Sequence, residues 1–308
     1  MQICFLNRSY NDFDTYAPLI ESFARTHDVT VFKIKSDGAW PPAHEAEPHL
    51  RKAGVLFKRA GRFTNLNNYL VIADEIVCKK GRTSINLTGH RNVHVILAGY
   101  NTHFEQYGTD IFDASFVRSF FVPDEHNKRL YENKFTGCKV EVSGPLRMAD
   151  SWINTLREIV EPCALPRTGQ NIVFMLSKPQ HGMIMREADN TIKALGRVAV
   201  KPHTRNMIYP VTAPAMDASH IPSPALIDWA DIVLGTSSSI ALHALKVGKP
   251  YGYLRYAQTH DSILNEFSVD SITELIEKIN DNSLATDPCF IEGDGIEDTK
   301  CKILMRAS

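Results

Sequence analysis

Long apolar runs, an excess of charge of one sign and closely spaced cysteines are all missing from this sequence of 308 residues. The apolar run at 93–98 has the length of a strand, whereas a membrane-spanning helix needs about 20 apolar residues. Lys and Arg number 34 against 35 Asp and Glu, which argues against a nucleic-acid-binding protein that works through bulk positive charge. The six cysteines are scattered without a C-x-x-C pair, which argues against a disulfide framework or a zinc site.

What remains is the composition of an ordinary globular protein, with 44% hydrophobic and 22% charged residues. The first residues, Met1 to Leu6, lead directly into an expected strand, so we expect no signal peptide. We therefore expect a cytoplasmic protein. Association with the inner face of a membrane, through an acceptor or a partner, stays open.

Short apolar runs alternate with helical patterns along nearly the whole chain, which is typical of βαβ units and a parallel sheet. In the first half we expect strands at 3–6, 29–34, 93–98, 120–123 and 139–142, and helices at 15–26, 66–77, 124–132 and 149–160. In the second half we expect strands at 171–176, 197–200, 232–234 and 251–255, and helices at 182–195 and 271–279. After about Pro288 the pattern is weak and predicts no element.

A break at 161–169 contains two prolines and a glycine and is the best candidate for a linker. It predicts an α/β protein with two Rossmann-like domains facing a cleft, at 1–160 and 161–308. A single large domain is the alternative.

The segment from Trp229 to Pro250 carries the strongest local signal. A buried strand turns at Gly235 into the hydroxyl cluster Thr236, Ser237, Ser238 and Ser239, and an apolar-periodic helix follows. Hydroxyls cap the free N–H groups of a helix start, and the same N–H groups bind phosphate. At the carboxyl edge of a parallel sheet this arrangement predicts an anion site. A well-capped helix without a ligand is the alternative interpretation.

A second signal follows the expected strand at 197–200. It places Lys201, His203 and Arg205 in one short stretch, Lys-Pro-His-Thr-Arg. If this stretch lies at the same sheet edge as the serine cluster, its charges could neutralise a pyrophosphate. A loop histidine with solvated neighbours is the alternative.

These two motifs together resemble the C-terminal half of GT-B glycosyltransferases. The unit formed by an acidic-apolar strand, serines, a helix and Gly248-Lys-Pro250 is most similar to enzymes that use cytidine-activated donors: CDP-glycerol glycerophosphotransferases of teichoic-acid type, capsule Kdo transferases and bacterial sialyltransferases. The stretch from Val142 to Arg147 resembles the family's segment between the domains. The resemblance covers about 93–255, and nucleotide-sugar 2-epimerases share the general scheme.

The resemblance implies that the second domain binds the donor, with the phosphate and nucleotide held by Lys201, His203, Thr204, Arg205, Gly235, Thr236, Ser237, Ser238, Ser239 and His243. Two positions depart from the family pattern. Thr204 replaces the proline that follows the family's histidine. His243 stands where many members have an acidic residue for a ribose hydroxyl, although a purely structural helix histidine is equally consistent with the sequence. Both departures leave the donor open.

The first domain should then hold the acceptor, with Arg8 and Asn11 on the acceptor side. Candidates for a general base are Glu105, His103 and Asp12, because deprotonating an acceptor hydroxyl requires a positioned carboxylate or imidazole. Asn11 and Asp12 could instead cap the next helix.

Two further loops are weaker candidates: the first is equally consistent with a surface turn, and the second is more consistent with a solvated basic loop. Lys178 and His181 could face the donor phosphates. Arg59, Arg62 and Asn65 could touch an anionic acceptor.

We therefore expect a metal-independent transferase without a cofactor. It would use a CMP- or CDP-linked donor and a glycan acceptor in the synthesis of a bacterial surface polysaccharide, with His203 among the catalytic residues. The alternatives are an isomerase of the nucleotide-sugar 2-epimerase kind and a non-catalytic nucleotide-binding module.

Overall fold

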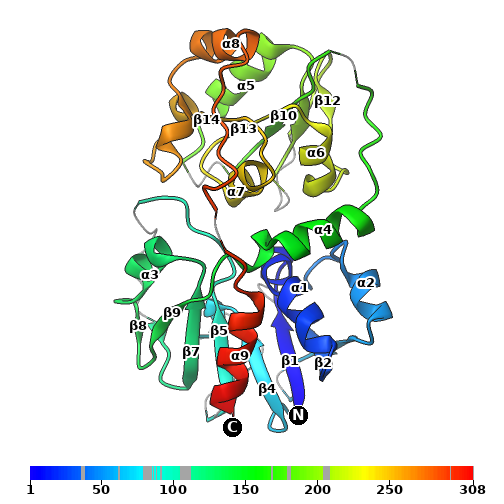
Figure 1. The fold of residues 1–308 in the computed structure, drawn as a ribbon, viewed down its shortest axis with the longest axis vertical. Coiled ribbons are helices and arrows are strands. Elements are labelled where there is room, and N and C mark those ends of the chain that lie inside the picture. Colours follow the sequence, from blue (N-terminus) through cyan, green and yellow to red (C-terminus); the bar gives the residue numbers. More distant parts are fainter. Residues whose placement is uncertain are drawn as a thin grey trace. The chain divides into compact units, whose positions relative to one another are not determined.

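The computed structural model describes residues 1–35, 39–61, 63–78, 85, 87, 89–90, 92–104, 112–167, 169–178, 182–203, 209–291 and 293–307. The chain divides into two units (Figure 1). The first contains Met1–Tyr100, Tyr107–Ile159 and Glu292–Ser308, and the second contains Asn101–Gln106 and Val160–Ile291. The predicted fold class, α/β with two Rossmann-like domains, is confirmed, because each unit is built on its own parallel sheet.

The first unit has a seven-stranded sheet in the order β3-β2-β1-β4-β5-β7-β9, with parallel pairing throughout. Its strands are β1 (Gln2–Asn7), β2 (Asp28–Ile34), β3 (Leu56–Ala60), β4 (Tyr69–Ala73), β5 (Val93–Ile96), β7 (Val117–Val122) and β9 (Val140–Val142). The described helices are α1 (Tyr10–Ala24), α2 (Glu47–Lys52), α3 (Glu125–Tyr131), α4 (Asp150–Ile159) and α9 (Ile296–Ala307), with 3-10 turns η1 (Glu75–Cys78) and η2 (Leu146–Met148). A small separate sheet pairs β6 (Phe112–Asp113) with β8 (Phe135–Thr136).

The second unit has a six-stranded parallel sheet in the order β12-β11-β10-β13-β14-β15. Its strands are β10 (Ile172–Met175), β11 (Ala199–Lys201), β12 (Met216–Asp217), β13 (Ile232–Gly235), β14 (Tyr251–Leu254) and β15 (Ser268–Val269). The described helices are α5 (Met185–Leu195), α6 (Ser223–Trp229), α7 (Ser239–Lys246) and α8 (Ile272–Asn280), with 3-10 turns η4 (Arg255–Ala257) and η5 (Asn265–Phe267).

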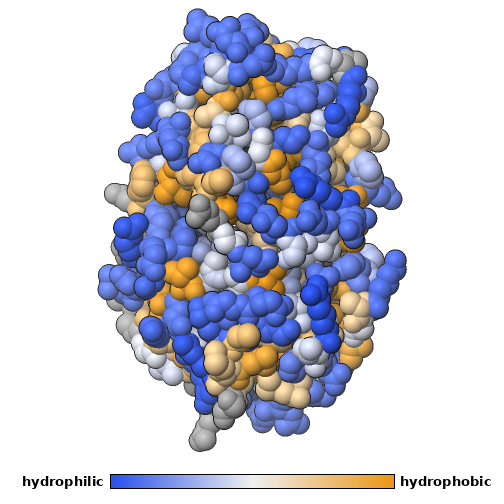
Figure 2. Space-filling view, in the orientation of Figure 1, coloured by the Kyte–Doolittle hydropathy of each residue, from blue (hydrophilic) through white to orange (hydrophobic). Residues whose placement is uncertain are grey.

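The central strands of both sheets have residues that are almost all buried. The strands β5, β10, β13 and β14 have no exposed position. Strands covered on both faces appear in the sequence as continuous apolar runs. Hydrophilic residues dominate the face drawn in Figure 2, and hydrophobic residues appear there in small separate groups. The apolar residues of these runs therefore form the cores of the units rather than their surface.

The prediction of a helix at 66–77 is wrong. This stretch contains β4 and the turn η1. Its apolar run is short and does not alternate, and such a run does not distinguish a doubly covered strand from a buried helix. The error matters for the site, because Asp74 and Glu75 stand at the carboxyl end of β4 rather than within a helix.

The C-terminal part of the chain differs from the expected division at 161–308. Helix α9, which the weak pattern after Pro288 did not reveal, belongs to the first unit and lies beside α1 (Figure 1). The ammonium group of Lys300 donates to the carbonyl of Ser22 on α1 at 2.8 Å. Just before α9, Gly295 lets the backbone pass close to Ser143, because a Cβ at position 295 would lie 1.5 Å from the carbonyl oxygen of Ser143. The last residues thus complete the first unit.

Within the described residues, no helix has the length and apolar character needed to cross a bilayer.

Candidate functional site

The second unit carries two sequence motifs: the stretch that begins at Lys201 and includes His203, and the hydroxyl cluster from Thr236 to Ser239, called the serine turn below. Both begin at the same edge of its sheet. Met175 at the end of β10 pairs with Lys201 at the end of β11 on one side and with Gly235 at the end of β13 on the other. Neighbouring strands are about 4.8 Å apart, so the ends of β11 and β13 are separated by roughly 10 Å. His203 follows Lys201 by two positions, and the serine turn follows Gly235 directly. Both therefore leave the sheet at one level of its carboxyl edge, where parallel sheets bind ligands.

Position 235, at the start of the serine turn, has no room for a side chain. A Cβ there would lie 2.8 Å from the Tyr251 hydroxyl and 3.2 Å from the carbonyl oxygen of Met175. The Tyr251 hydroxyl occupies this space to donate to the carbonyl of Thr236 at 2.9 Å. The glycine thus serves the packing of the turn.

The hydroxyls of Thr236 and Ser237 are committed to partners inside the second unit. Thr236 pairs with Ser177 at the end of β10. Ser237 is 2.5 Å from the Thr102 hydroxyl and donates to the Ser262 hydroxyl at 2.8 Å. Ser262 in turn donates to the carbonyl of Thr102 at 2.8 Å, which closes a ring of hydrogen bonds. We therefore assign Thr236 and Ser237 to holding the turn, in contrast to the phosphate contacts expected from the sequence.

Ser238 and Ser239 remain partly exposed at the start of α7. Ser238 is the N-cap, and its hydroxyl accepts from the amide of Ile240 at 3.5 Å. A helix start presents free N–H groups and the positive end of the helix dipole to an anion. Within the hydroxyl cluster, Ser238 and Ser239 are the two residues that stand at this helix start, and the predicted anion site there stays a prediction. His243, one turn further along α7, is buried.

Lys201 occupies a structural position. Its ammonium group donates to the carbonyls of Ser219 at 2.8 Å and Ile221 at 2.5 Å, in the segment that leads into α6. The side chain is buried, and both contacts are with backbone. We leave Lys201 out of the proposed donor site for this reason.

Several predicted residues remain predictions. His203 and Lys178 are each partly exposed at the carboxyl edge of the second sheet. Thr204, Arg205 and His181 lie outside the described residues, as do Glu105 and Arg62. Arg59 stacks its guanidinium over the ring of Trp40 at 4.9 Å, and Asn65 accepts from the amide of Asn67.

His103 lies in the second unit, not in the acceptor-side domain where the sequence placed it. It forms an antiparallel bridge with Ser262, and its ring meets that of His260 edge-on at 5.8 Å. The amide of Ile263 donates to the carbonyl of Thr102 at 2.9 Å. The described residues 101–104 are thus bound to the loop that follows β14.

Arg8 and Asp12 form a buried ion-pair cluster in the first unit. The Nε of Arg8 donates to Asp74 Oδ2 at 2.7 Å, and its Nη2 lies 3.2 Å from Asp12 Oδ1. Asp12 also forms a capping box with Ser9, whose amide donates to Asp12 Oδ2 at 2.8 Å. Both groups therefore have internal partners, and the roles of Arg8 as an anion contact and of Asp12 as a general base stay predictions. Asn11 is partly buried beside them.

Asp74 and Glu75 were missed because their segment was predicted to be helical. Burial, followed by the charge of Asp12, raises the pKa of Asp74 well above its usual value. Burial also raises the pKa of Glu75, whose carboxylate accepts from the amide of Ala98 at 2.9 Å. Charged residues directly after an apolar run were the available signal, since that position marks the end of a strand.

The chain also contains an Asp-x-Asp pair, Asp12-Phe-Asp14, on α1. Asp12 is engaged as described, and Asp14 accepts from Arg147 Nη1 at 2.8 Å and lies 3.5 Å from His44 Nε2. Among the described residues, no group of three His, Cys, Asp or Glu side chains is arranged to hold a metal ion.

Comparison with known proteins shows similarity in structure alone. No family model matches the chain, and no curated protein matches its sequence. A structure of the wall teichoic acid polymerase TagF (H444N + CDPG) matches with a TM-score of 0.59 and 10% identity, covering 99% of this chain and 88% of that chain. UDP-GlcNAc 2-epimerase from Neisseria meningitidis bound to UDP-GlcNAc matches with a TM-score of 0.61 and 12% identity, covering 99% and 100%. UDP-GlcNAc 2-epimerase from Methanocaldococcus jannaschii matches with a TM-score of 0.54 and 10% identity, covering 99% of each chain. The chain therefore has the GT-B fold of these enzymes, with two Rossmann-like α/β domains.

Proposed function

We propose that this protein is a metal-independent transferase that binds a nucleotide-activated donor, CMP- or CDP-linked, at the carboxyl edge of the second sheet. The observation that carries the proposal is the common pairing of Met175 with Lys201 and Gly235, which brings His203 and the start of α7 to one level. Two similar structures support a nucleotide ligand, since one is of TagF with CDPG and the other is of a 2-epimerase bound to UDP-GlcNAc. The acceptor would be a glycan of a bacterial surface polysaccharide.

The chemistry follows from the charge that develops on the leaving phosphate. An acceptor hydroxyl attacks the anomeric carbon of a CMP-linked sugar or the phosphorus of a CDP-linked polyol, and its proton passes to a general base. The bond to the nucleotide phosphate breaks at the same time. The N–H groups at Ser238 and Ser239 and a protonated His203 would stabilise the departing anion without a metal ion. Glu105 and His103 stay the candidates for the base.

An isomerase of the nucleotide-sugar 2-epimerase kind is the second candidate. It is supported by the match to the Neisseria meningitidis enzyme, which covers 99% of this chain and 100% of that enzyme. Such an enzyme converts a UDP-sugar without any acceptor, and proton NMR of the UDP-sugar pool would detect the epimer. A non-catalytic module would bind the nucleotide and leave both kinds of donor unchanged.

A thermal-shift comparison of CMP, CDP, UDP and GDP tests the binding site. A nucleotide at 100 times its dissociation constant adds about 2.7 kcal/mol to the stability of the folded state. We expect CMP or CDP to give the largest shift and His203→Ala to abolish it. The matched control is His220→Ala, because His220 is an exposed histidine of the same unit and should leave the shift intact. The proposal fails if no nucleotide stabilises the protein, or if His203→Ala responds like the parent.

A further inference from the structure

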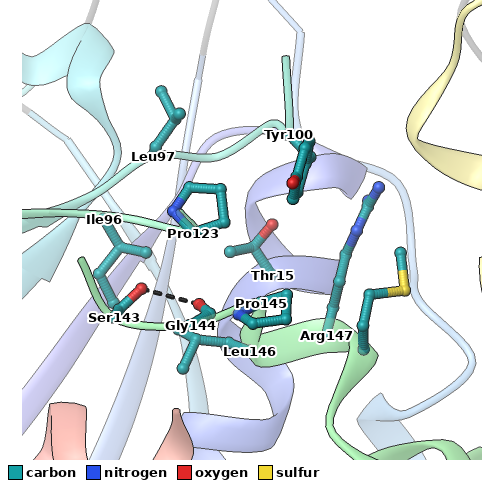
Figure 3. Close-up of a pocket in the computed structure, with 11 residues that line it drawn as sticks. Thr15, Ile96, Leu97, Tyr100, Pro123, Ser143, Gly144, Pro145, Leu146 and Arg147 are labelled. Atoms are coloured by element: carbon teal, nitrogen blue, oxygen red, sulfur yellow. Dashed lines mark hydrogen bonds between the residues drawn. The ribbon is translucent and has the colours of Figure 1, made fainter. Parts of the chain in front are cut away.

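One pocket of the first unit lies at the carboxyl ends of β5, β7 and β9, with Tyr100, Ser143 and Arg147 among its lining residues (Figure 3). It offers about 20 Å³, which is room for one water molecule. Its cation is neutralised within the unit, because Arg147 Nη1 donates to Asp14 at 2.8 Å. The solvent-facing cations of the same unit are placed differently.

The segment from 48 to 73 is basic, although the charge of the whole chain is balanced. It contains no Asp or Glu, and its Lys and Arg residues are Arg51, Lys52, Lys58, Arg59 and Arg62. Arg62 lies outside the described residues, and the other four are exposed. Two of them stand at the end of α2 and two on β3, so positive charge is concentrated where α2 is followed by β3.

Aromatic rings hold several of these cations in place along β3. This strand is the edge of the seven-stranded sheet and pairs with β2 alone. The guanidinium of Arg59 lies 4.9 Å from the centre of the Trp40 ring, and the ammonium of Lys35 lies 5.4 Å from the same ring. Arg51 stacks on Phe57 at 4.3 Å. Because side chains alternate along a strand, Phe57 and Arg59 lie on one face of β3, and the stacked cations form a row.

The cations of this row keep their charge. Four exposed cations make no ion pair with any described residue: Lys35, Lys52, Lys58 and Arg59. Together with Arg51, which is 53% exposed and lies 3.9 Å from a Glu47 oxygen, they are called the basic edge below. Lys33 on β2 differs, because Glu47 neutralises it at 2.5 Å. A ring attracts a cation without cancelling its charge, so the basic edge presents positive charge to solvent.

Phe63 stands directly beyond the basic edge with 95% of its surface exposed. It lies in a turn that is closed by hydrogen bonds: the amide of Thr64 donates to the carbonyl of Gly61 at 2.9 Å, and the amide of Gly61 donates to the Thr64 hydroxyl at 3.0 Å. Leu56, at the start of β3, is 54% exposed. Single exposed apolar side chains are ordinary, but apolar side chains beside clustered cations are typical of surfaces that dock on anionic bilayers.

The observations favour a bilayer over other partners. Protection of an edge strand against pairing explains Lys58 and Arg59, but it explains neither the cations of α2 nor Phe63. A nucleic acid stacks its bases on accessible rings, whereas Trp40 and Phe57 are partly buried and already stacked with cations. A second copy docking through the same surface would bring like charges together.

We propose that the basic edge and Phe63 dock the protein on an anionic phospholipid bilayer, with the cations among the lipid phosphates and the Phe63 ring inserted between the headgroups. Each cation held near such a surface strengthens binding by about fivefold. The proposal goes beyond the donor site of the second unit, and docking requires no nucleotide.

Sedimentation of the full chain with lipid vesicles, in the absence of nucleotide, tests the proposal. One set of vesicles contains phosphatidylcholine alone, and the other contains equal parts of phosphatidylcholine and phosphatidylglycerol. We expect the protein to sediment with the anionic vesicles and to stay in solution with the neutral ones. Added salt should release it, because salt screens exposed charges. Absence of binding to the anionic vesicles would overturn the proposal.

Two variants locate the docking surface. Lys58→Gln combined with Arg59→Gln should weaken binding to the anionic vesicles by about 25-fold, because two cations are lost. Phe63→Ser should weaken it by about fivefold, because the inserted ring is lost. Lys193→Gln combined with Arg197→Gln, at exposed sites of the second unit, is the control for charge. Met305→Ser, at a side chain that is 70% exposed on α9, is the control for apolar surface.

Each outcome decides for or against the bilayer. Melting curves verify that the variants fold, and if the double variant at positions 58 and 59 does not fold, Phe63→Ser still reports on the surface. Equal losses in the variants and their controls would contradict the proposal. A soluble polyphosphate chain is the competing probe. If it binds with the same dependence on positions 58 and 59 while the vesicles bind nothing, the occupant is a soluble polyanion and the proposal is wrong.

Discussion

The hydroxyl of Thr102 lies 2.5 Å from the hydroxyl of Ser237 in the second unit. These residues are 135 positions apart, and Ser262 links them through a hydroxyl and a carbonyl contact. All three hydroxyls are buried. The ring they form fixes the turn that precedes α7, so the orientation of the helix start depends on a residue from a distant part of the sequence.

Breaking this ring should destabilise the second unit. Thr102→Val and Ser237→Ala each leave buried polar partners unsatisfied, at a cost of about 1–3 kcal/mol. The double variant should be less destabilised than the sum of the two, by about 1 kcal/mol, because the shared bond is lost once. Urea unfolding of the four proteins measures this coupling. Thr286→Val and Ser283→Ala, at exposed sites, are the controls, and strict additivity would contradict the ring.

Lys201 and His203 should respond differently to substitution. Lys201→Met loses two buried bonds to backbone carbonyls and should lower the free energy of unfolding by about 2–3 kcal/mol while the nucleotide-induced shift persists. His203→Ala should leave the free energy of unfolding nearly unchanged and abolish the nucleotide-induced shift. Melting curves with and without CDP distinguish the two, with exposed Lys193→Met as control. If Lys201→Met is as stable as the parent but shows no nucleotide-induced shift, this prediction is wrong and Lys201 belongs to the donor site.

Arg8 should be essential to the stability of the first unit. Arg8→Met leaves the carboxylates of Asp12 and Asp74 buried without their cation, which costs about 3–5 kcal/mol. Without Arg8, the pKa of Asp74 rises further in the folded state, so the loss is greatest at neutral pH and shrinks on acidification. Denaturant unfolding at several pH values measures this.

Two controls accompany the Arg8 experiment. Arg25→Met removes an arginine whose side chain is 67% exposed and should change stability by no more than about 0.5 kcal/mol. Adding Asp74→Asn to Arg8→Met should recover part of the loss, because it removes one of the uncompensated charges. No recovery would indicate that the packing of Arg8, rather than its charge, is what matters.

His94 should make the first unit sensitive to acid. Its Nδ1 lies 2.9 Å from the Ser119 hydroxyl, and burial, then the charges of Arg118 and Arg306, lower the pKa of His94 from 6.5 to about 4. Between these values the unfolded chain binds the proton and the folded chain does not, so stability falls as pH drops from 6.5 to 4. The contribution of this group is roughly 3 kcal/mol.

His94→Asn removes this titration and should flatten the pH dependence of unfolding over that window. Urea titrations between pH 4 and pH 7 measure the slope. His220→Asn, at an exposed histidine, should keep the slope of the parent. A variant at position 94 with an unchanged slope would show that His94 does not govern the acid response.

Much of the fold could be predicted from local patterns. The strand β13, the turn at Gly235 and the N-cap at Ser238 follow from an apolar run, a glycine and hydroxyls in adjacent positions. Ser271 likewise caps α8, with the amide of Glu274 donating to its hydroxyl at 3.1 Å. These features depend on neighbours within a few residues, and the sequence order already contains them.

The candidate site was less predictable because its partners are distant in sequence. Lys201 has the charge of a phosphate ligand, but whether it binds phosphate or carbonyls depends on where Ser219 and Ile221 lie. Arg8 has the charge of an anion contact, yet its partner Asp74 follows the end of β4, far away in the sequence. Residue type establishes what a side chain can bind, and only the packing of the chain establishes which partner it has.

By itself the sequence determined the α/β class and the two motifs that end β11 and β13, because burial of doubly covered strands and capping of helix starts leave a local imprint. The tertiary structure decided that Thr102 completes the serine turn, that α9 returns to the first unit and that Tyr100, Ser143 and Arg147 line one pocket. Each of these results from side chains that meet only when strands remote in sequence are assembled into a sheet, and no local periodicity encodes that meeting.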